Sequence, residues 1–197
     1  MIRNKSFWTR FKGHWNTVYT HKKWVYHYGK LMGIRWQAAI HDLSKYNPIE
    51  FLEGVKYWTG SCSPIDVCKK ANGWSRAWMH HKGRNPHHYE YWVDNLDRGG
   101  IALDMPRKYK LELLCDYLAA GRAYMGSMFS YTDELLWWEN KRSGGIKMHE
   151  NVERFLTDVF IHMSVCEPAN NDDHFYDAQL DQELKNYVAG RIKEEGF

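Results

Sequence analysis

The segment HDLSKY, residues 41–46, brings a histidine, an aspartate and a lysine together within little more than one helical turn. Imidazole and carboxylate groups are common ligands of transition metals, and an ammonium group can hold a phosphate. His41 and Asp42 therefore suggest half of a metal site, with Lys45 as a phosphate anchor beside it. A solvated polar helix face is the alternative interpretation when this segment is considered alone.

Further candidate ligands lie on two other predicted helices. His21 falls on or next to the apolar face of the first predicted helix, which is an unusual place for an unpaired imidazole. Asp116 lies within the apolar segment LELLCDYLAAG, and a buried carboxylate is unfavourable unless a cation compensates it. Alanines at positions 119, 120 and 123 leave space on the same side of the helix. A metal ion would compensate the carboxylate fully.

Four histidines occur within nine residues of the segment WMHHKGRNPHHYEYW. Helical phase favours His81 and His88 as metal ligands. His80 and His87 are interpreted as groups that support the ligands or face a substrate. In chain order the predicted ligands, all on helices, are His21, His41, Asp42, His81, His88 and Asp116.

In type and order these residues resemble the HD-domain superfamily of metal-dependent phosphohydrolases, whose signature is a histidine, a His-Asp doublet and a distal aspartate. The extra histidines between doublet and distal aspartate resemble the two-metal branches, which include HD-GYP phosphodiesterases and HD-type di-iron oxygenases. HDLSK is similar to the HD-x-G-K motif of HD-GYP proteins, in which the lysine contacts phosphate. Lys45 matches that lysine, and Ser44 replaces the glycine. The GYP tripeptide is absent, so specificity for cyclic dinucleotides is not implied.

The full pattern, including NPHHYEYW and CDYLAAGRAY, is most similar to a family of small bacterial and phage proteins of unknown function that carry HD-like motifs. The superfamily resemblance covers about residues 14–125. It implies an HD-like metal-binding core over that range, a helical extension over residues 126–197, and a single domain in total. The C-terminal third lies outside the resemblance.

The resemblance implies two divalent transition metal ions, of iron, manganese, cobalt or zinc, at the six predicted ligands. Ions that share Asp42 would activate a hydroxide for attack on a nucleotide or another small phosphoester. Asp42 and Lys45 are the predicted catalytic residues, and the predicted substrate-binding residues are Lys45, Arg84, His87 and Arg122. Two alternatives remain open: an HD-type di-iron oxygenase with nearly the same ligands, and a metal-binding or nucleotide-binding sensor without turnover.

Helices account for most of the sequence, because apolar residues recur at helical spacing and no alternating pattern indicates a strand. Asn47, Pro48 and Glu50 form a helix start signal, in which asparagine caps the helix and glutamate completes a capping box. Gly99 and Gly100 break the chain. The expected fold is an all-α bundle, with helices over residues 14–33, 35–46, 48–58, 74–81, 87–92, 107–125, 132–141, 148–166 and 178–193.

The net charge of +3 is too small to indicate nucleic-acid binding. No apolar signal segment and no uninterrupted apolar stretch of membrane-spanning length occurs. Four cysteines without a C-x-x-C pair are interpreted as reduced thiols of a cytoplasmic protein. The partner that the resemblance implies is a small phosphorylated substrate, and a homodimer is left open.

Histidines outside the predicted site are interpreted as surface or structural residues. His14 and His27 are expected at the surface or the rim, and His149 and His162 are expected to be structural. The segment NNDDHF, residues 170–175, is interpreted as a solvated turn rather than a cation site.

Overall fold

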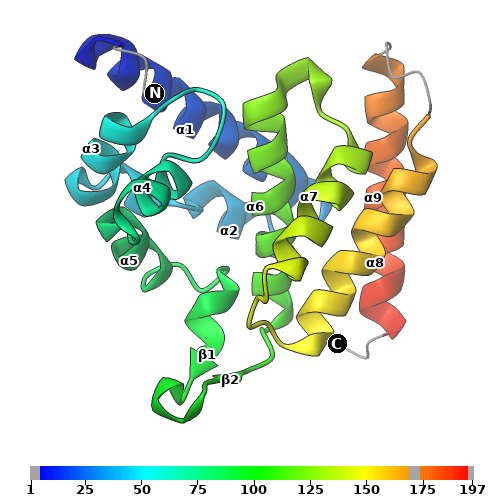
Figure 1. Ribbon diagram of the computed structural model, residues 1–197. Coiled ribbons are helices and arrows are strands. Elements are labelled where there is room, and N and C mark those ends of the chain that lie inside the picture. The colour runs from blue at the N-terminus through cyan, green and yellow to red at the C-terminus, as the bar shows by residue number, and fades with distance from the viewer. Residues whose placement is uncertain (1–4, 169–173, 195–197) are drawn as a thin grey trace.

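The computed structural model describes residues 5–168 and 174–194, so the NNDDHF segment lies largely outside the described residues. Helices predominate, which confirms the predicted all-α class (Figure 1). The α-helices are α1 (Phe7–Leu31), α2 (Arg35–Ile40), α3 (Pro48–Tyr57), α4 (Pro64–Asn72), α5 (Arg76–Lys82), α6 (Arg107–Met125), α7 (Tyr131–Ser143), α8 (Glu150–Cys166) and α9 (His174–Glu194). Short 3₁₀ turns are η1 (Leu43–Tyr46), η2 (Tyr89–Trp92), η3 (Leu96–Arg98) and η4 (Gly126–Met128).

A small antiparallel hairpin joins β1 (Val93–Asp94) to β2 (Ile101–Ala102). The sequence does not predict it, because two-residue strands are too short to leave an alternating pattern. Gly99 and Gly100, at the expected chain break, have φ values of 89° and 74°. Such positive φ values are available to glycine without steric cost, which explains why the chain can reverse here.

Helix α6 lies at the centre of the molecule, with α1 packed along it (Figure 1). Helices α3, α4 and α5 lie on one side of α6, and α7, α8 and α9 lie on the other. The apolar core is built from α1, α6, α7, α8 and α9, with fully buried side chains that include Tyr28, Leu114, Trp138, Phe160 and Leu184. Because neighbours cover it on several sides, α6 buries polar residues as well, including Glu112 and Asp116.

Most predicted helices are confirmed, some with shifted ends. The predicted helix over residues 107–125 matches α6, and α4 forms in a segment where no helix is predicted. α1 begins at Phe7, well before the predicted start at His14, because Ser6 caps it by accepting a hydrogen bond from the Thr9 backbone N–H at 3.2 Å. Within the described residues, every helix is too short or too polar to cross a bilayer.

Two predicted helices are wrong, and both contain candidate ligands. Instead of one helix over residues 35–46, α2 ends at Ile40, His41 has a non-helical backbone, and Asp42 adopts the left-handed conformation with φ 54° and ψ 30°. Instead of a helix over residues 87–92, His87 and His88 lie in a turn that only the short η2 follows. Residues 41–42 are referred to below as the His-Asp turn.

The helix start at Asn47 is confirmed except for its glutamate. Asn47 Oδ1 accepts a hydrogen bond from the Ile49 backbone N–H at 3.0 Å, and Pro48 is the first residue of α3. The Glu50 carboxylate does not complete a capping box. It forms hydrogen bonds with two histidines of α5 instead. The carboxylate that the local sequence assigns to the helix cap therefore has other partners.

A close approach of α1 and α2 sets the position of the His-Asp turn. Gly29 in α1 is buried, and a Cβ atom built there would lie 2.3 Å from the Cβ of the fully buried Ala38 in α2. A Cβ is fixed to the backbone, so rotation of a side chain cannot relieve this overlap. The absence of a side chain at Gly29 therefore lets α2 lie against α1.

Replacing Gly29 with alanine is expected to lower the free energy of unfolding by about 1–3 kcal/mol, because α1 and α2 must move apart. The matched control is Gly190→Ala in α9, where a Cβ meets nothing within 4 Å and alanine favours the helix by roughly 0.5–1 kcal/mol. Urea unfolding of both variants measures the difference. Equal stability of the two variants would show that the close approach is not a constraint.

Candidate metal centre

All six predicted metal ligands lie together in the structure, in two overlapping groups that share Asp42. Within each group one ligand atom from every residue lies within 4.8 Å of the others, and all the residues are buried. The first group is His21, His41, Asp42 and Asp116, and the second is Asp42, His81, His87 and His88.

The first group joins α1, the His-Asp turn and α6. His21 Nε2 lies 3.1 Å from Asp116 Oδ1 and 3.4 Å from His41 Nε2. His41 Nε2 lies 3.3 Å from Asp116 Oδ1 and 3.1 Å from Asp42 Oδ2. Neighbouring ligands at bond lengths of ~2.1 Å are about 3.0–3.4 Å apart in octahedral or tetrahedral geometry, so these spacings fit a shared ion.

The second group joins the His-Asp turn, α5 and the turn before η2. The distances to Asp42 Oδ1 are 3.3 Å from His81 Nε2 and 3.4 Å from His87 Nε2. The His88 ring packs against that of His81, with 4.8 Å between centroids. His87, which the sequence predicts to bind substrate, is buried among the ligand groups and does not line the adjacent cavity. Both His87 and His88 lie in a turn, so helical phase cannot indicate which of them faces the ligand groups.

Glu112 contacts one histidine of each group, at the ring nitrogen that faces away from Asp42. Its Oε1 lies 2.9 Å from His41 Nδ1 and 3.3 Å from His87 Nδ1. Sequence reasoning misses this carboxylate. The signal that points to it is its place one turn before Asp116 in the same apolar helix, where a second buried carboxylate also needs compensation.

Glu50 has the same relation to the histidines of α5. It accepts hydrogen bonds from His81 Nδ1 at 2.8 Å and from His80 Nδ1 at 2.6 Å. Ser44 Oγ donates to the same carboxylate at 3.2 Å. His80 therefore supports the site from outside, in one of the two roles predicted for it.

These hydrogen bonds determine which nitrogen of each ring is available. A carboxylate at Nδ1 holds the proton there and leaves the Nε2 lone pair of a neutral ring free as a ligand. The Nε2 atoms of His41, His81 and His87 face oxygens of Asp42, so a proton or a metal ion is needed between nitrogen and oxygen. Both Asp42 oxygens and the Nε2 atoms of His87 and His88 are buried without a well-formed hydrogen bond. This donor set fits transition metal ions with mixed nitrogen and oxygen ligands.

The pKa values of the buried histidines depend on the balance between burial and neighbouring carboxylates. Burial lowers the pKa of His21 to about 4 and also lowers that of His88, so both rings are neutral at pH 7. Burial opposes the charged form of His41 as well, but Asp42, Asp116 and Glu112 outweigh burial and raise its pKa well above the usual value. The carboxylates around His41 therefore stabilise positive charge at this point.

The left-handed backbone of Asp42 allows two adjacent side chains to converge. Neighbouring side chains on a helix point about 100° apart, whereas the His-Asp turn brings His41 Nε2 within 3.1 Å of Asp42 Oδ2. Asp42 has a φ of 54°, a conformation that is uncommon outside glycine and that aspartate tolerates better than most residues. This left-handed conformation costs on the order of 1 kcal/mol. The strained residue, Asp42, lies at the centre of the site.

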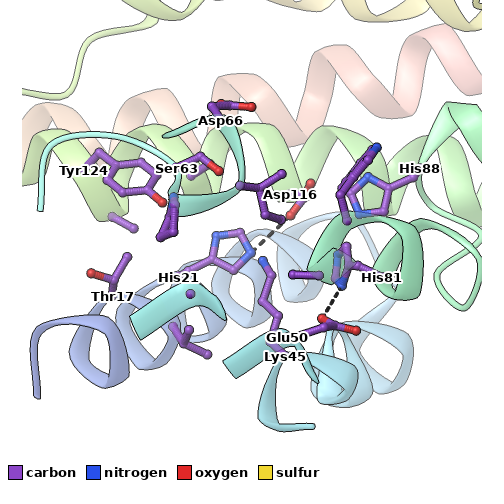
Figure 2. A pocket seen from close by; sticks show the side chains of 18 of the residues that line it. Thr17, His21, Lys45, Glu50, Ser63, Asp66, His81, His88, Asp116 and Tyr124 are labelled. Atoms are coloured by element: carbon purple, nitrogen blue, oxygen red, sulfur yellow. Dashed lines mark hydrogen bonds and ion pairs between the residues drawn. The ribbon is translucent and has the colours of Figure 1, made fainter. Parts of the chain in front are cut away.

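A cavity of about 240 Å³ opens beside the two groups (Figure 2). His21, His81, His88 and Asp116 reach its wall, whereas the other ligands lie behind them. Ala120 and Ala123 line the wall near Asp116, as the sequence predicts, whereas Ala119, predicted on the same side, is buried in the apolar core. Figure 2 shows Ser63 and Tyr124 on the side of the cavity away from His81 and His88. The candidate ligands are thus accessible from the cavity rather than sealed in the core.

Lys45 lies between the ligand groups and the cavity. Its Nζ is 2.6 Å from Asp42 Oδ2, and its side chain lines the cavity with 25% exposure. Burial disfavours its charged form, but Asp42 and Asp116 outweigh burial and raise the pKa of Lys45 above its usual value. A permanent positive charge therefore lies at the floor of the cavity, where the sequence predicts a phosphate anchor.

The two predicted substrate-binding arginines do not line this cavity. Arg84 is exposed, donates a hydrogen bond to the His80 backbone carbonyl at 3.1 Å, and does not line the cavity. Arg122 is buried on a different face of α6 from Asp116, because six residues correspond to about 240° around a helix. Its guanidinium carbon lies 4.1 Å from the ring centroid of Phe129.

The remaining histidines are placed in part as expected. His14 is buried rather than at the surface, and it lines the cavity next to Gly54, where a Cβ atom would lie 2.2 Å from His14 Nε2. His27 pairs with Asp181 at 2.7 Å outside the site. His149 caps α8 by accepting a hydrogen bond from the Asn151 backbone N–H at 3.2 Å, which is a structural role.

Comparison with known proteins gives one match, to a protein family. No curated protein and no solved structure matches the chain. Residues 10–162 match the model of DUF5662, a family of unknown function, and this range contains every residue of both ligand groups. The predicted similarity to a family of unknown function is confirmed, and the relation to the HD-domain superfamily stays a prediction. Because the match covers more than half of its length, the chain belongs to the DUF5662 family.

Proposed function

We propose that this protein is a metal-dependent phosphohydrolase that cleaves a small phosphoester such as a nucleotide. The observation that carries the proposal is the position of Lys45, whose ammonium group lies between two convergent ligand groups and a cavity. A fixed cation at this point attracts an anionic substrate group to the metal ligands. A purely structural metal site has no need of such a charge.

Two ions would be held by the two ligand groups, with Asp42 common to both. When bound, such ions lower the pKa of water and polarise a phosphoryl oxygen, and both effects favour hydrolysis of a phosphoester. The nitrogen and oxygen donors suit iron, manganese, cobalt or zinc. Glu50 and Glu112 keep the ligand rings oriented, because each accepts hydrogen bonds from the ring nitrogen that faces away from Asp42.

Lys45 would bind a phosphoryl oxygen and hold the phosphorus against the ligand groups. Its positive charge opposes the negative charge that gathers on the phosphoryl oxygens during transfer. Lys69 and Lys141 also line the cavity, but Lys45 is the lysine that contacts a candidate metal ligand, Asp42. The substrate is thereby oriented with its phosphate at the floor and its organic part toward the opening.

The walls of the cavity support a compact organic substrate. A volume of about 240 Å³ is small for a ligand pocket and excludes a folded macromolecule. Trp78, Tyr117 and Trp137 line the cavity with aromatic rings that suit stacking of a base. Ser63 and Asp66 add hydrogen-bonding groups that suit a sugar hydroxyl. These side chains favour a nucleotide over a simple alkyl phosphate.

The first prediction concerns metal content. Asp42→Gly removes the shared carboxylate, and glycine adopts the left-handed backbone freely, so this variant is expected to lose two transition metal ions per chain relative to the wild type. His88→Gln alters the second group alone and is expected to lose one. Elemental analysis after anaerobic reconstitution measures both, with circular dichroism to establish folding.

The matched control for metal content is His27→Gln, because His27 lies outside both groups and pairs with Asp181. It is expected to keep the wild-type content. Equal metal content in the wild type and Asp42→Gly would contradict the assignment of both groups.

The second prediction concerns turnover. Lys45→Met keeps the length of the side chain but removes its charge, so kcat/KM for phosphoester hydrolysis is expected to fall roughly 10²–10³-fold while metal is retained. Lys23→Met, at an exposed position of α1, is the control. The assay is release of phosphate from a panel of nucleotides and other phosphomonoesters by metal-loaded protein under anaerobic conditions.

Anaerobic turnover would exclude an oxygenase as the sole activity. Tight nucleotide binding by metal-loaded protein without release of phosphate would replace the hydrolase with a sensor. Full activity of Lys45→Met would remove the phosphate anchor from the proposal.

The third prediction separates the two supporting carboxylates. Glu112→Gln is expected to weaken metal binding at both groups by roughly 10–100-fold, because Glu112 contacts His41 and His87. Glu50→Gln is expected to weaken only the second group, through His81. Competition with a chelator for cobalt measures the two affinities. Identical profiles for the two variants would contradict these roles.

A further inference from the structure

A separate cluster of metal-ligand side chains lies between α8 and α9. His162 and Cys166 are four residues apart on α8, and Glu183 faces them from α9. One nitrogen, one sulfur and one oxygen atom of these residues lie within 4.8 Å of one another. These three residues, the α8–α9 cluster, neither line the cavity nor belong to the groups around Asp42.

The distances within the α8–α9 cluster are close to those of a metal site. Cys166 Sγ lies 3.5 Å from His162 Nε2, which is the separation of about 3.5 Å expected for sulfur and nitrogen ligands of one tetrahedral zinc ion. Glu183 Oε1 lies 2.6 Å from the same nitrogen, as a hydrogen bond. Coordination requires this oxygen to move outward by less than about 1 Å, and the Glu183 side chain is 41% exposed and free to do so.

The imidazole of the α8–α9 cluster is held in a fixed orientation. The ring of Tyr187, one turn after Glu183 on α9, stacks on that of His162 with 3.8 Å between centroids and 7° between planes. The other side of α9 is anchored by Leu180, Leu184 and Val188 in the apolar core. Both helices are therefore set before any ion binds, which lowers the ordering needed for coordination.

We propose that His162, Cys166 and Glu183 bind a divalent ion of the zinc type and thereby link α9 to α8. A thiolate, an imidazole and a carboxylate together suit zinc, which is borderline soft, better than magnesium or calcium. Cys166 is exposed, so solvent can supply the fourth ligand. When the metal binds, the thiol loses its proton to solvent, and the proton on His162 Nε2 moves to Nδ1 or to solvent, so that Nε2 can coordinate. The inference stands independently of the proposed hydrolase.

Cobalt(II) offers a test that reports on this cluster alone. A bond from cobalt to a thiolate gives an intense near-ultraviolet charge-transfer band, which nitrogen and oxygen ligands do not give, and the groups around Asp42 contain no sulfur. Chelator-treated full-length protein, with its thiols reduced, is titrated with cobalt. In the wild type we expect the band to saturate at one thiolate-bound ion per chain.

Matched variants identify the ligands. Cys166→Ser is expected to abolish the band and His162→Gln to weaken binding at least tenfold, whereas Cys62→Ser, at another exposed thiol, is expected to keep it. Asp42→Gly is also expected to keep the band, which separates this site from the proposed hydrolytic centre. Added zinc is expected to raise the melting temperature of the wild type and of Cys62→Ser by more than that of Cys166→Ser, which keeps only the groups around Asp42.

Absence of the band from the wild type would overturn the proposal, as would a band that survives Cys166→Ser. Loss of the band in Cys62→Ser would assign it to a different thiol and would equally overturn the site. An equal rise in melting temperature for the wild type and Cys166→Ser on adding zinc would show that the ion does not link the two helices through this thiol.

Discussion

Burial of several carboxylates close together is the constraint on which this structure depends. Asp42, Glu50, Glu112 and Asp116 are each 8% exposed or less. A carboxylate at that depth requires a cation or several hydrogen-bond donors, or it is strongly destabilising. Histidine rings and one lysine surround these four groups. The packing of α1 against α6, and of α3 against α1 and α5, brings those partners together.

Helix α6 separates a polar half of the molecule from an apolar half. Glu112 and Asp116, four residues apart, meet the histidines, whereas Leu114 and Leu118 join the core with Trp138 and Phe160. The apolar contacts keep α6 rigid while its other face carries charge. The C-terminal third also contributes to the cavity through Trp137 and Lys141 of α7. It therefore belongs to the site, although no motif in it indicates this.

Helical periodicity predicts the fold class and most helices, because in those segments tertiary contacts do not override the local helical preference. The ligand set could be predicted because a rare combination of residue types occurs in one order. The His-Asp turn could not, since HDLSKY lacks glycine and proline and only the convergence on Asp116 requires a left-handed residue. The positions of Arg122 and His87 away from the cavity could not be predicted for a related reason. Which way a side chain points depends on backbone conformation and helix phase relative to partners far away in sequence.

Shared residues connect the two ligand groups. Asp42 belongs to both, and Glu112 contacts one ring in each, so occupancy of one group alters the charge and orientation of ligands in the other. If both groups held ions, thermodynamic reciprocity would require each ion to change the affinity for the other by the same factor. A substitution at Asp42 or Glu112 would then alter metal affinity at both positions.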